Sequence, residues 1–417
     1  MQAMTKQRHM DMLNGPLWSK LPRYALPVAA TGILGQLFNA ADVAVVGNFT
    51  GELRTVAVAA VGANSPVIGL LLNLFIGIAL GANVVIANAI GRGDRETVHR
   101  AVHTSIVTAL VGGVLVALFG QLVAGKLMGL LNVPEDVYPL ALSYLRIYLL
   151  GMPVILLYNF EAAIFRSIGD TKMPLAALTV SGILNVLLNL FFVIVCHLGV
   201  AGVAIATVVS QYIALALVLI CLLRLEGCAR LELKKLHFYP DEALRMIQIG
   251  LPAGLQSVIF NISNVMIQSS INSFGANVIA ANTAAANLDA FVYTACNSVY
   301  HAAMTFTSQN LGAGKHERIR RGAIQASVIM ALLAALSAGA GLLMTIGDTY
   351  FHVFLSADKG TPETIRYGNA FLYVDYAMYL LLGGIFLMRN CDQGIGRSQF
   401  TLAGGAAELV ARIAVSS

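Results

Sequence analysis

The segment GRGDRE at residues 91–96 has a counterpart in the same chain, GAGKHE at residues 312–317. Working outward from this pair, the stretch 27–100 recurs as 252–321, shifted by about 222 positions. The offset drifts by a few residues, as expected for two old copies with small loop changes. The chain is therefore predicted to contain two like halves. Shorter anchors of the same repeat are Ala25-Leu26-Pro27 with Gly250-Leu251-Pro252, and Phe38-Asn39 with Phe260-Asn261.

The composition indicates a membrane protein. Of 417 residues, 58% are hydrophobic and 11% are charged, whereas soluble domains carry roughly 25% charged residues. A helix crosses a hydrocarbon core of about 30 Å with about 20 residues, and the apolar runs here reach that length without the alternation of barrel strands. We predict an all-α polytopic membrane protein with eleven helices, near residues 24–48, 57–90, 101–125, 137–160, 173–196, 199–223, 244–273, 277–311, 320–346, 362–389 and 397–417.

Two helical bundles follow from the repeat. Six helices return the chain to the side where it began, so the halves are predicted to be parallel repeats related by rotation about an axis near the membrane normal. The helices at 57–90 and 277–311 are expected to exceed one span and to end in the matched basic loops, which should lie together on the cytoplasmic side. The predicted organisation is an N-terminal arm (1–23), a first lobe (24–224), a linker (225–243) and a second lobe (244–417).

Charge predicts orientation. Most of the 26 Lys and Arg residues fall in the N-terminal arm and in alternate loops, which places the N-terminus in the cytoplasm and the chain as a multi-pass protein of the inner or plasma membrane. The net charge of +5 is explained by this topology, so no nucleic-acid partner is expected. The arm lacks an apolar core, and we expect no signal peptide. We expect the chain to be surrounded by membrane lipid and to act as a monomer.

Asp42 is the leading candidate for chemistry inside a span. It lies in PVAATGILGQLFNAADVAVVG, residues 27–47, and an acid at that depth costs at least about 2.5 kcal/mol. Loss of water disfavours a charged carboxylate, so such a group is suited to taking up and releasing protons. The alternative is a structural acid bonded to a neighbouring helix. Pro27 lacks an N–H and is a candidate bend point, or a proline near a helix start.

Other polar residues within predicted spans leave two interpretations open. Asp289 serves function or structure, and Asp375 lines a polar cavity or faces the lipid headgroups. Glu408 pairs with Arg412 one turn later and is interpreted as structural. Amides and hydroxyls bond between helices or line a central water-filled cavity. They include Asn185 and Asn189 at i,i+4 spacing, Thr207, Ser210, Gln211, Gln256, Asn261, Asn264 and Gln268.

Enzyme and metal signatures are poor. The chain has no HExxH, nucleophile elbow or P-loop. His99 and His103 have metal-ligand spacing but flank Arg100 at a helix start, so we interpret them as a solvated face. No enzyme activity, resident metal or cofactor is expected. An intramembrane enzyme, kept as an alternative of another class, would need a paired-acid or Ser/His constellation, and a channel would need a filter-like loop.

Three long motifs carry a family resemblance. YNFEAAIFRSIGDTKMPLAALTVSGILNVLLNLFFVI (158–194), GVAGVAIATVVSQ (199–211) and TSQNLGAGKHERIRRG (307–322) resemble the multidrug and toxic compound extrusion (MATE) family over nearly the whole chain. Asn39-Ala40-Ala41-Asp42, with Pro27 fifteen residues before the aspartate, looks like the DinF-like branch. Phe260-Asn261 stands where the NorM branch has a glutamate.

The resemblance implies a twelve-helix antiporter of two six-helix lobes around a cleft. It would export amphipathic, often cationic drugs or metabolites in exchange for protons or sodium by alternating access. By motif match, Asp42 is the branch's aspartate on the first helix, and Asn189 replaces a second aspartate found in archaeal members, so a two-carboxylate site is not expected. The matching polar cluster is Asn185, Asn189 and Thr207, and Asn39 and Tyr144 are candidates beside it.

An alternative within transport is a flippase for lipids or lipid-linked saccharides. Such a protein is expected to show several basic residues in its cleft, whereas only Arg146 and Arg412 are predicted well inside spans. The last predicted helix ends at Ser417, so the second lobe is expected to lack the twelfth helix of the family plan.

Overall fold

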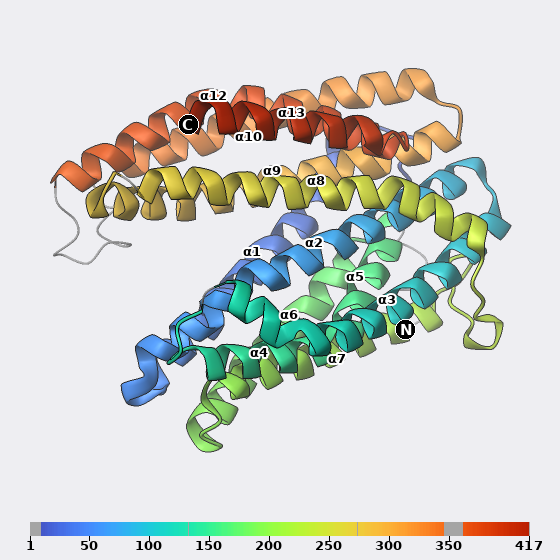
Figure 1. The fold of residues 1–417 in the computed structure, drawn as a ribbon. Helices are drawn as coiled ribbons and strands as arrows, with labels where there is room; N and C mark the ends of the chain where they lie inside the picture. The colour runs from blue at the N-terminus through green and yellow to red at the C-terminus, as the bar shows by residue number, and fades with distance from the viewer. Residues whose placement is uncertain (1–9, 132, 273, 346–361, 417) are drawn as a thin grey trace.

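The computed structural model describes residues 10–131, 133–272, 274–345 and 362–416, and within these ranges the regular structure is helical (Figure 1). Each of the eleven predicted helices has a counterpart, which confirms the all-α polytopic fold class; residues 1–9, 273, 346 and 417 of the predicted segments lie outside the described ranges. The helices are α1 (Leu17–Phe49), α2 (Arg54–Arg92), α3 (Arg95–Leu130), α4 (Tyr138–Leu150), α5 (Met152–Ser167), α6 (Lys172–Leu190), α7 (Gly199–Leu223), α8 (Pro240–Asn272), α9 (Ala276–Gly312), α10 (His316–Thr345), α12 (Pro362–Gly394) and α13 (Ser398–Ser416), with short turns at Gly51–Leu53, Phe191–Val195 and Leu233–Lys235.

The helix predicted at 137–160 is broken. It forms α4 and α5, which meet at Gly151 with a bend of 51° and together count as one span. Pro153 explains the break, because proline lacks an N–H and disfavours helical geometry in the residue before it. Within the described residues, eight other helices are long and apolar enough to cross a membrane. Neither α9 nor α13 is among them; α9 packs against α1, α2, α10 and α12, so much of its polar surface faces protein.

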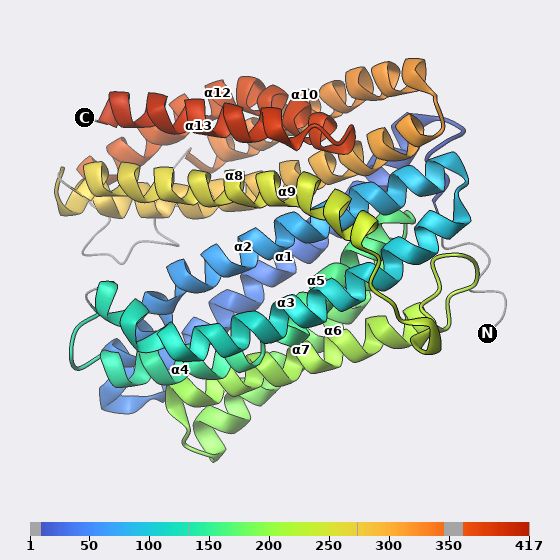
Figure 2. The ribbon, with the colours of Figure 1, turned by 45° about the vertical axis from the view of Figure 1, so that its right-hand side comes forward.

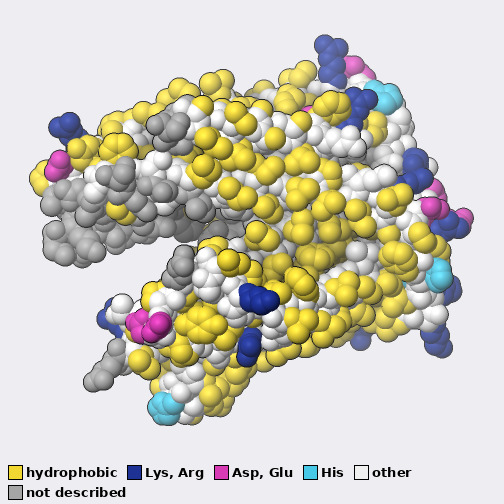
Figure 3. All heavy atoms as spheres, in the orientation of Figure 1, with side chains coloured by type: hydrophobic (Ala, Val, Ile, Leu, Met, Phe, Trp, Pro, Cys, Tyr) yellow, Lys and Arg dark blue, Asp and Glu magenta, His cyan; other side chains and the backbone are white. Residues whose placement is uncertain are grey.

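The helices form two lobes, α1–α7 and α8–α13, that meet at one end and diverge toward the other (Figures 1 and 2). The space-filling view shows a hollow between the lobes at the divergent end, while Lys and Arg side chains gather at the end where the lobes meet (Figure 3). We call the latter the basic end. It contains the loops that follow α2 and α9.

Four glycines bring the two lobes into backbone contact. Gly77 and Gly81 of α2 face Gly250 and Gly254 of α8. A Cβ added to Gly254 would lie 2.7 Å from the Leu74 carbonyl oxygen, which no side chain tolerates. This spacing of small residues four apart allows two helices in a membrane to approach closely.

At the basic end, the repeated motifs lie against each other. Gly91 touches the backbone at Gln309, and Gly312 touches the backbone at Asn88. The two copies share the same turn: Gly93 and Gly314 both have φ of 69°, in the left-handed region that glycine tolerates. The two matched loops therefore lie together, as their sequences predicted.

Hydrogen bonds join the lobes beside these loops. The Ser308 hydroxyl donates to the Val84 carbonyl at 2.7 Å, and the Thr305 hydroxyl donates to Asn83 Oδ1 at 3.1 Å. All four residues are buried. These bonds link α9 to α2.

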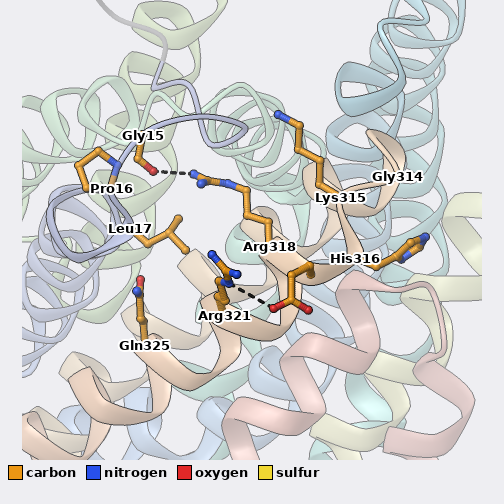
Figure 4. Close-up of a pocket in the computed structure, with 10 residues that line it drawn as sticks. Gly15, Pro16, Leu17, Gly314, Lys315, His316, Arg318, Arg321 and Gln325 are labelled. Carbon is orange, nitrogen blue, oxygen red and sulfur yellow. Dashed lines mark hydrogen bonds and ion pairs between the residues drawn. The ribbon is translucent and has the colours of Figure 1, made fainter.

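Residues 10–16, the N-terminal strap, also cross the basic end. The carbonyl of the fully buried Met12 accepts hydrogen bonds from Asn310 Nδ2 at 3.2 Å and from the Arg318 guanidinium at 3.3 Å. Arg318 also donates to the Gly15 carbonyl at 3.0 Å (Figure 4). Lys315 donates to the Leu13 carbonyl at 2.9 Å. The strap thus ties the N-terminus to the loop between α9 and α10.

Candidate coupling site and central cavity

Asp42 lies inside the first lobe, where α1 packs against α6 and α7. Its side chain is buried, with 6% of its surface exposed. Asn189 Nδ2 donates to Asp42 Oδ1, and the Thr207 hydroxyl lies 3.4 Å from Asp42 Oδ2. The carboxylate therefore faces polar side chains from two other helices.

Asn185 completes this cluster. It accepts from Asn189 Nδ2 at 3.3 Å, and its own amide lies 3.5 Å from the Thr207 hydroxyl oxygen. Thr207 also reaches the Val203 carbonyl at 3.0 Å, and a hydroxyl has one hydrogen to donate. The carbonyl oxygen of the Asn189 side chain is buried without a hydrogen-bond partner among the described residues. Among the described residues, the cluster's hydrogen bonds thus leave one buried acceptor unused.

Two further predicted residues, Tyr144 and Pro27, also lie in the first lobe. Tyr144 of α4 is buried and stacks on Tyr148 at 6.2 Å between ring centroids, and both rings lie within electrostatic range of Asp42. Pro27 lies inside α1, which begins at Leu17, seven residues before the predicted start. The interpretation of Pro27 as a helix-start proline is therefore wrong, and its missing N–H interrupts the hydrogen bonding of α1.

The other first-lobe candidates lie apart from Asp42's hydrogen bonds. Asn39 is exposed on α1, three residues after the cavity-lining Gln36 and so on the same helix face. Gln211 of α7 has a side-chain carbonyl buried without a partner among the described residues.

A cavity of about 470 Å³ lies between the two lobes, within the usual range for sites that hold drug-sized molecules. Its first-lobe side comes from α1 and α2, next to the glycine contact at Gly77, and its second-lobe side from α8, α9 and α12. Asn261, predicted as a cavity residue, lines it and donates to the Ser257 carbonyl at 2.9 Å. Other amide side chains in its wall are Gln36, Asn73, Gln256, Asn297, Asn390 and Gln393.

Arg389 also lines this cavity, although its position in the chain suggested a basic loop. It lies within α12, and its side chain is 13% exposed. Arg389 Nη2 is 2.8 Å from Glu408 Oε2, and Arg412 Nη2 is 2.7 Å from Glu408 Oε1. The predicted pair of Glu408 and Arg412 is thus present, with a second arginine attached.

The second lobe holds the remaining predicted acids. Asp289 on α9 and Asp375 on α12 lie within electrostatic range of each other, and the Tyr379 hydroxyl donates to Asp289 Oδ1. Asp375 Oδ2 is buried without a partner among the described residues.

One histidine and one glutamate differ from what the sequence led us to expect. His103 is not solvated: it is fully buried, and its ring nitrogens contact the His99 carbonyl at 2.8 Å and the Glu232 backbone at 3.2 Å, which fastens the linker to α3. Among the described residues no cluster of three or more metal-binding side chains occurs.

Glu161 of α5 was not among the candidate residues chosen from the sequence. It is fully buried, and neither carboxylate oxygen has a partner in the described part of the chain.

Comparison with known proteins agrees with the repeat. The MatE family model matches residues 27–191 and again residues 252–416, once in each half. The probable multidrug resistance protein YoeA of Bacillus subtilis is 26% identical over 375 residues, covering 88% of this chain and 79% of that protein. An FAD transporter of Shewanella oneidensis is 26% identical over 325 residues (76% and 70%), and the DNA damage-inducible protein F of Escherichia coli is 25% identical over 315 residues (74% and 68%).

Solved structures show the same fold. The outward-facing conformation of a multidrug resistance MATE transporter of the MOP superfamily superposes with a TM-score of 0.86 at 21% identity, covering 94% of this chain and 86% of that one. A MATE structure in the bent conformation gives 0.84 with the same identity and coverage. Two matches to one family model, placed on the two halves of an all-helical membrane fold, establish that this chain belongs to the MatE (multidrug and toxic compound extrusion) family.

Proposed function

We propose that this protein is a secondary antiporter that exports amphipathic drugs or metabolites by alternating access, in exchange for protons taken up at Asp42. The observation that carries the proposal is the buried Asp42 carboxylate with donors from α6 and α7 around it. Membership of a family of multidrug efflux transporters supports export of drugs or toxic compounds. The relative described as protein F of Escherichia coli supports placing the chain in the DinF-like branch.

The lobes meet at the basic end and part at the other. If basic loops face the cytoplasm, this conformation is open to the outside, and the N-terminus lies in the cytoplasm of a cell whose plasma membrane holds the protein. Protonation changes one Asp42 oxygen from acceptor to donor, so the bonds from Asn189 and Thr207 cannot both persist unchanged. The resulting shift of α1, which Pro27 permits to bend, then favours one lobe arrangement over the other.

The donor set favours protons over sodium. Asn189 presents its N–H to Asp42 rather than its oxygen, and Thr207 approaches as a hydroxyl donor. A hard cation such as sodium prefers several oxygen ligands directed at one point. The proposal therefore assigns the proton as coupling ion, with sodium as the competing outcome of the experiment below.

Asp42→Asn tests the coupling. The amide keeps the size of the carboxylic acid but cannot release a proton, so we expect the purified variant to fold and to lose efflux driven by a pH gradient. Everted vesicles loaded with a fluorescent substrate, with pH and sodium gradients imposed separately, measure this. The matched control is Asp136→Asn, which alters an exposed acid before α4 and should transport as wild type does.

Two results would contradict the proposal. Transport by Asp42→Asn at the wild-type rate, with the same pH dependence, would remove Asp42 from the mechanism. Efflux driven by the sodium gradient alone would replace the proton with sodium.

A further inference from the structure

The wall of the central cavity has an unusual charge for an exporter of organic cations. Of the described residues that line it, none is Asp or Glu, and Arg389 is present. Two candidate acids are bonded away from the cavity: Asp42 within the first lobe, and Asp289 to Tyr379 in the second. A cationic ligand in this cavity would face a guanidinium without a lining carboxylate to balance it.

Arg389 keeps a positive charge at the wall despite its ion pair. Glu408 is shared between Arg389 and Arg412, with N–O distances of 2.8 and 2.7 Å. Two guanidinium groups and one carboxylate leave one net positive charge. Arg412 directs another nitrogen to Asn264 Oδ1 at 2.8 Å and does not line the cavity. The guanidinium available to a ligand in the cavity is therefore that of Arg389.

Three aromatic rings stand beside this charge. The Phe386 ring lies 5.7 Å from Tyr293 and 6.2 Å from Phe260, both edge to face, and all three residues line the cavity. The Arg389 guanidinium lies 5.4 Å from the Phe386 ring centroid. Rings in this arrangement offer faces and edges to a planar aromatic ligand, and the amide side chains around them supply hydrogen bonds.

On the basis of the proposed function, we propose that the central cavity binds planar aromatic compounds that carry an acidic group, with Arg389 as the residue that pairs with that group. Arginine is suited to this role because its planar fork binds carboxylate and phosphate through two parallel hydrogen bonds. The expectation of an amphipathic organic cation is thereby replaced by an amphipathic anion.

Two dyes with a common skeleton test the charge preference. Fluorescein is an anion and rhodamine 123 is a cation at pH 7.5, and both contain a xanthene ring system. Fluorescence anisotropy of each dye, titrated with the purified full chain in lipid nanodiscs, gives its affinity without requiring transport. We expect fluorescein to bind more tightly than rhodamine 123.

Arg389→Gln should weaken fluorescein binding about tenfold or more, the size expected for loss of a charged hydrogen bond, with little loss of rhodamine 123 binding. Arg389→Lys keeps the charge and should retain the preference for the anion. Arg366→Gln is the matched control, because it removes an arginine charge from an exposed position of the same helix, α12, outside the cavity wall. It should leave fluorescein binding within about threefold of wild type.

Tighter binding of rhodamine 123 than of fluorescein, equal fluorescein binding by wild type and Arg389→Gln, or no binding of fluorescein overturns this inference. Each variant is first shown to elute and melt as a folded protein. Failure of the coupling proposal is separable, because it would appear in vesicle transport by Asp42→Asn and would leave the binding preference at Arg389 unchanged.

Discussion

At the scale of single residues, two buried carboxyl groups of the first lobe differ in their hydrogen-bond partners. Asp42 is accompanied by donors on α6 and α7, whereas Glu161, also in the first lobe, has none for either oxygen among the described residues. Leaving a buried polar group unsatisfied costs about 1–3 kcal/mol. Glu161 is thus a cost to stability at a position where an apolar side chain of similar shape would fit.

Glu161→Met should raise stability. Methionine has a similar length and no polar oxygen, so we expect the free energy of unfolding to rise by about 1–3 kcal/mol, seen as a higher melting temperature of the purified protein in detergent at pH 8. Glu226→Met, at an exposed position in the linker, is the control and should change stability by no more than about 0.5 kcal/mol. A lower melting temperature for Glu161→Met would show that the carboxylate has a stabilising partner in the folded protein.

At the scale of helices, two glycines of α2 are expected to differ in how they tolerate substitution, because one of them contacts α8. Gly77 packs against the backbone of α8, whereas Gly69, two turns earlier, has nothing within 4 Å of an added Cβ among the described residues. Gly77→Ala should destabilise the protein by about 1–3 kcal/mol, because a methyl group must displace backbone. Gly69→Ala should stabilise α2 by up to about 1 kcal/mol through helix propensity. Equal melting temperatures for the two variants would argue against the close contact.

Much of this level of structure was predictable from the sequence. Hydrophobic length located the helices, and the repeat of residues 91–96 at 312–317 predicted that two loops would lie together. The i,i+4 spacing of Asn185 and Asn189 placed both on one face, where Asn189 donates to Asp42 and to Asn185. The spacing of residues along one helix shows which side chains share a face, but it does not show which other helix packs against that face. The sequence therefore did not reveal that Arg389 lines the cavity, nor that His103 fastens the linker.

At the scale of the whole molecule, the basic end should face the cytoplasm. In a background without the five native cysteines, Arg95→Cys places a thiol at the exposed start of α3 at the basic end, and Leu53→Cys places one at the opposite end, where the native side chain is 58% exposed. A membrane-impermeant maleimide added to intact cells should label Leu53→Cys and should reach Arg95→Cys only after permeabilisation. The reverse pattern would invert the orientation and turn the open side toward the cytoplasm.

Backbone contact between α2 and α8 has a consequence for the rate of motion. Glycine has no side-chain rotamers to rearrange when two helices rotate against each other. The contact between Gly77 and Gly254 can therefore act as a pivot with a low energy barrier to rotation. Resistance to turning then comes mainly from bonds at the basic end, such as those from Ser308 to Val84 and from Thr305 to Asn83, each worth about 1 kcal/mol net. A few bonds of this size give a free-energy difference between the two lobe arrangements that is small enough for the binding of one proton or one ligand to reverse.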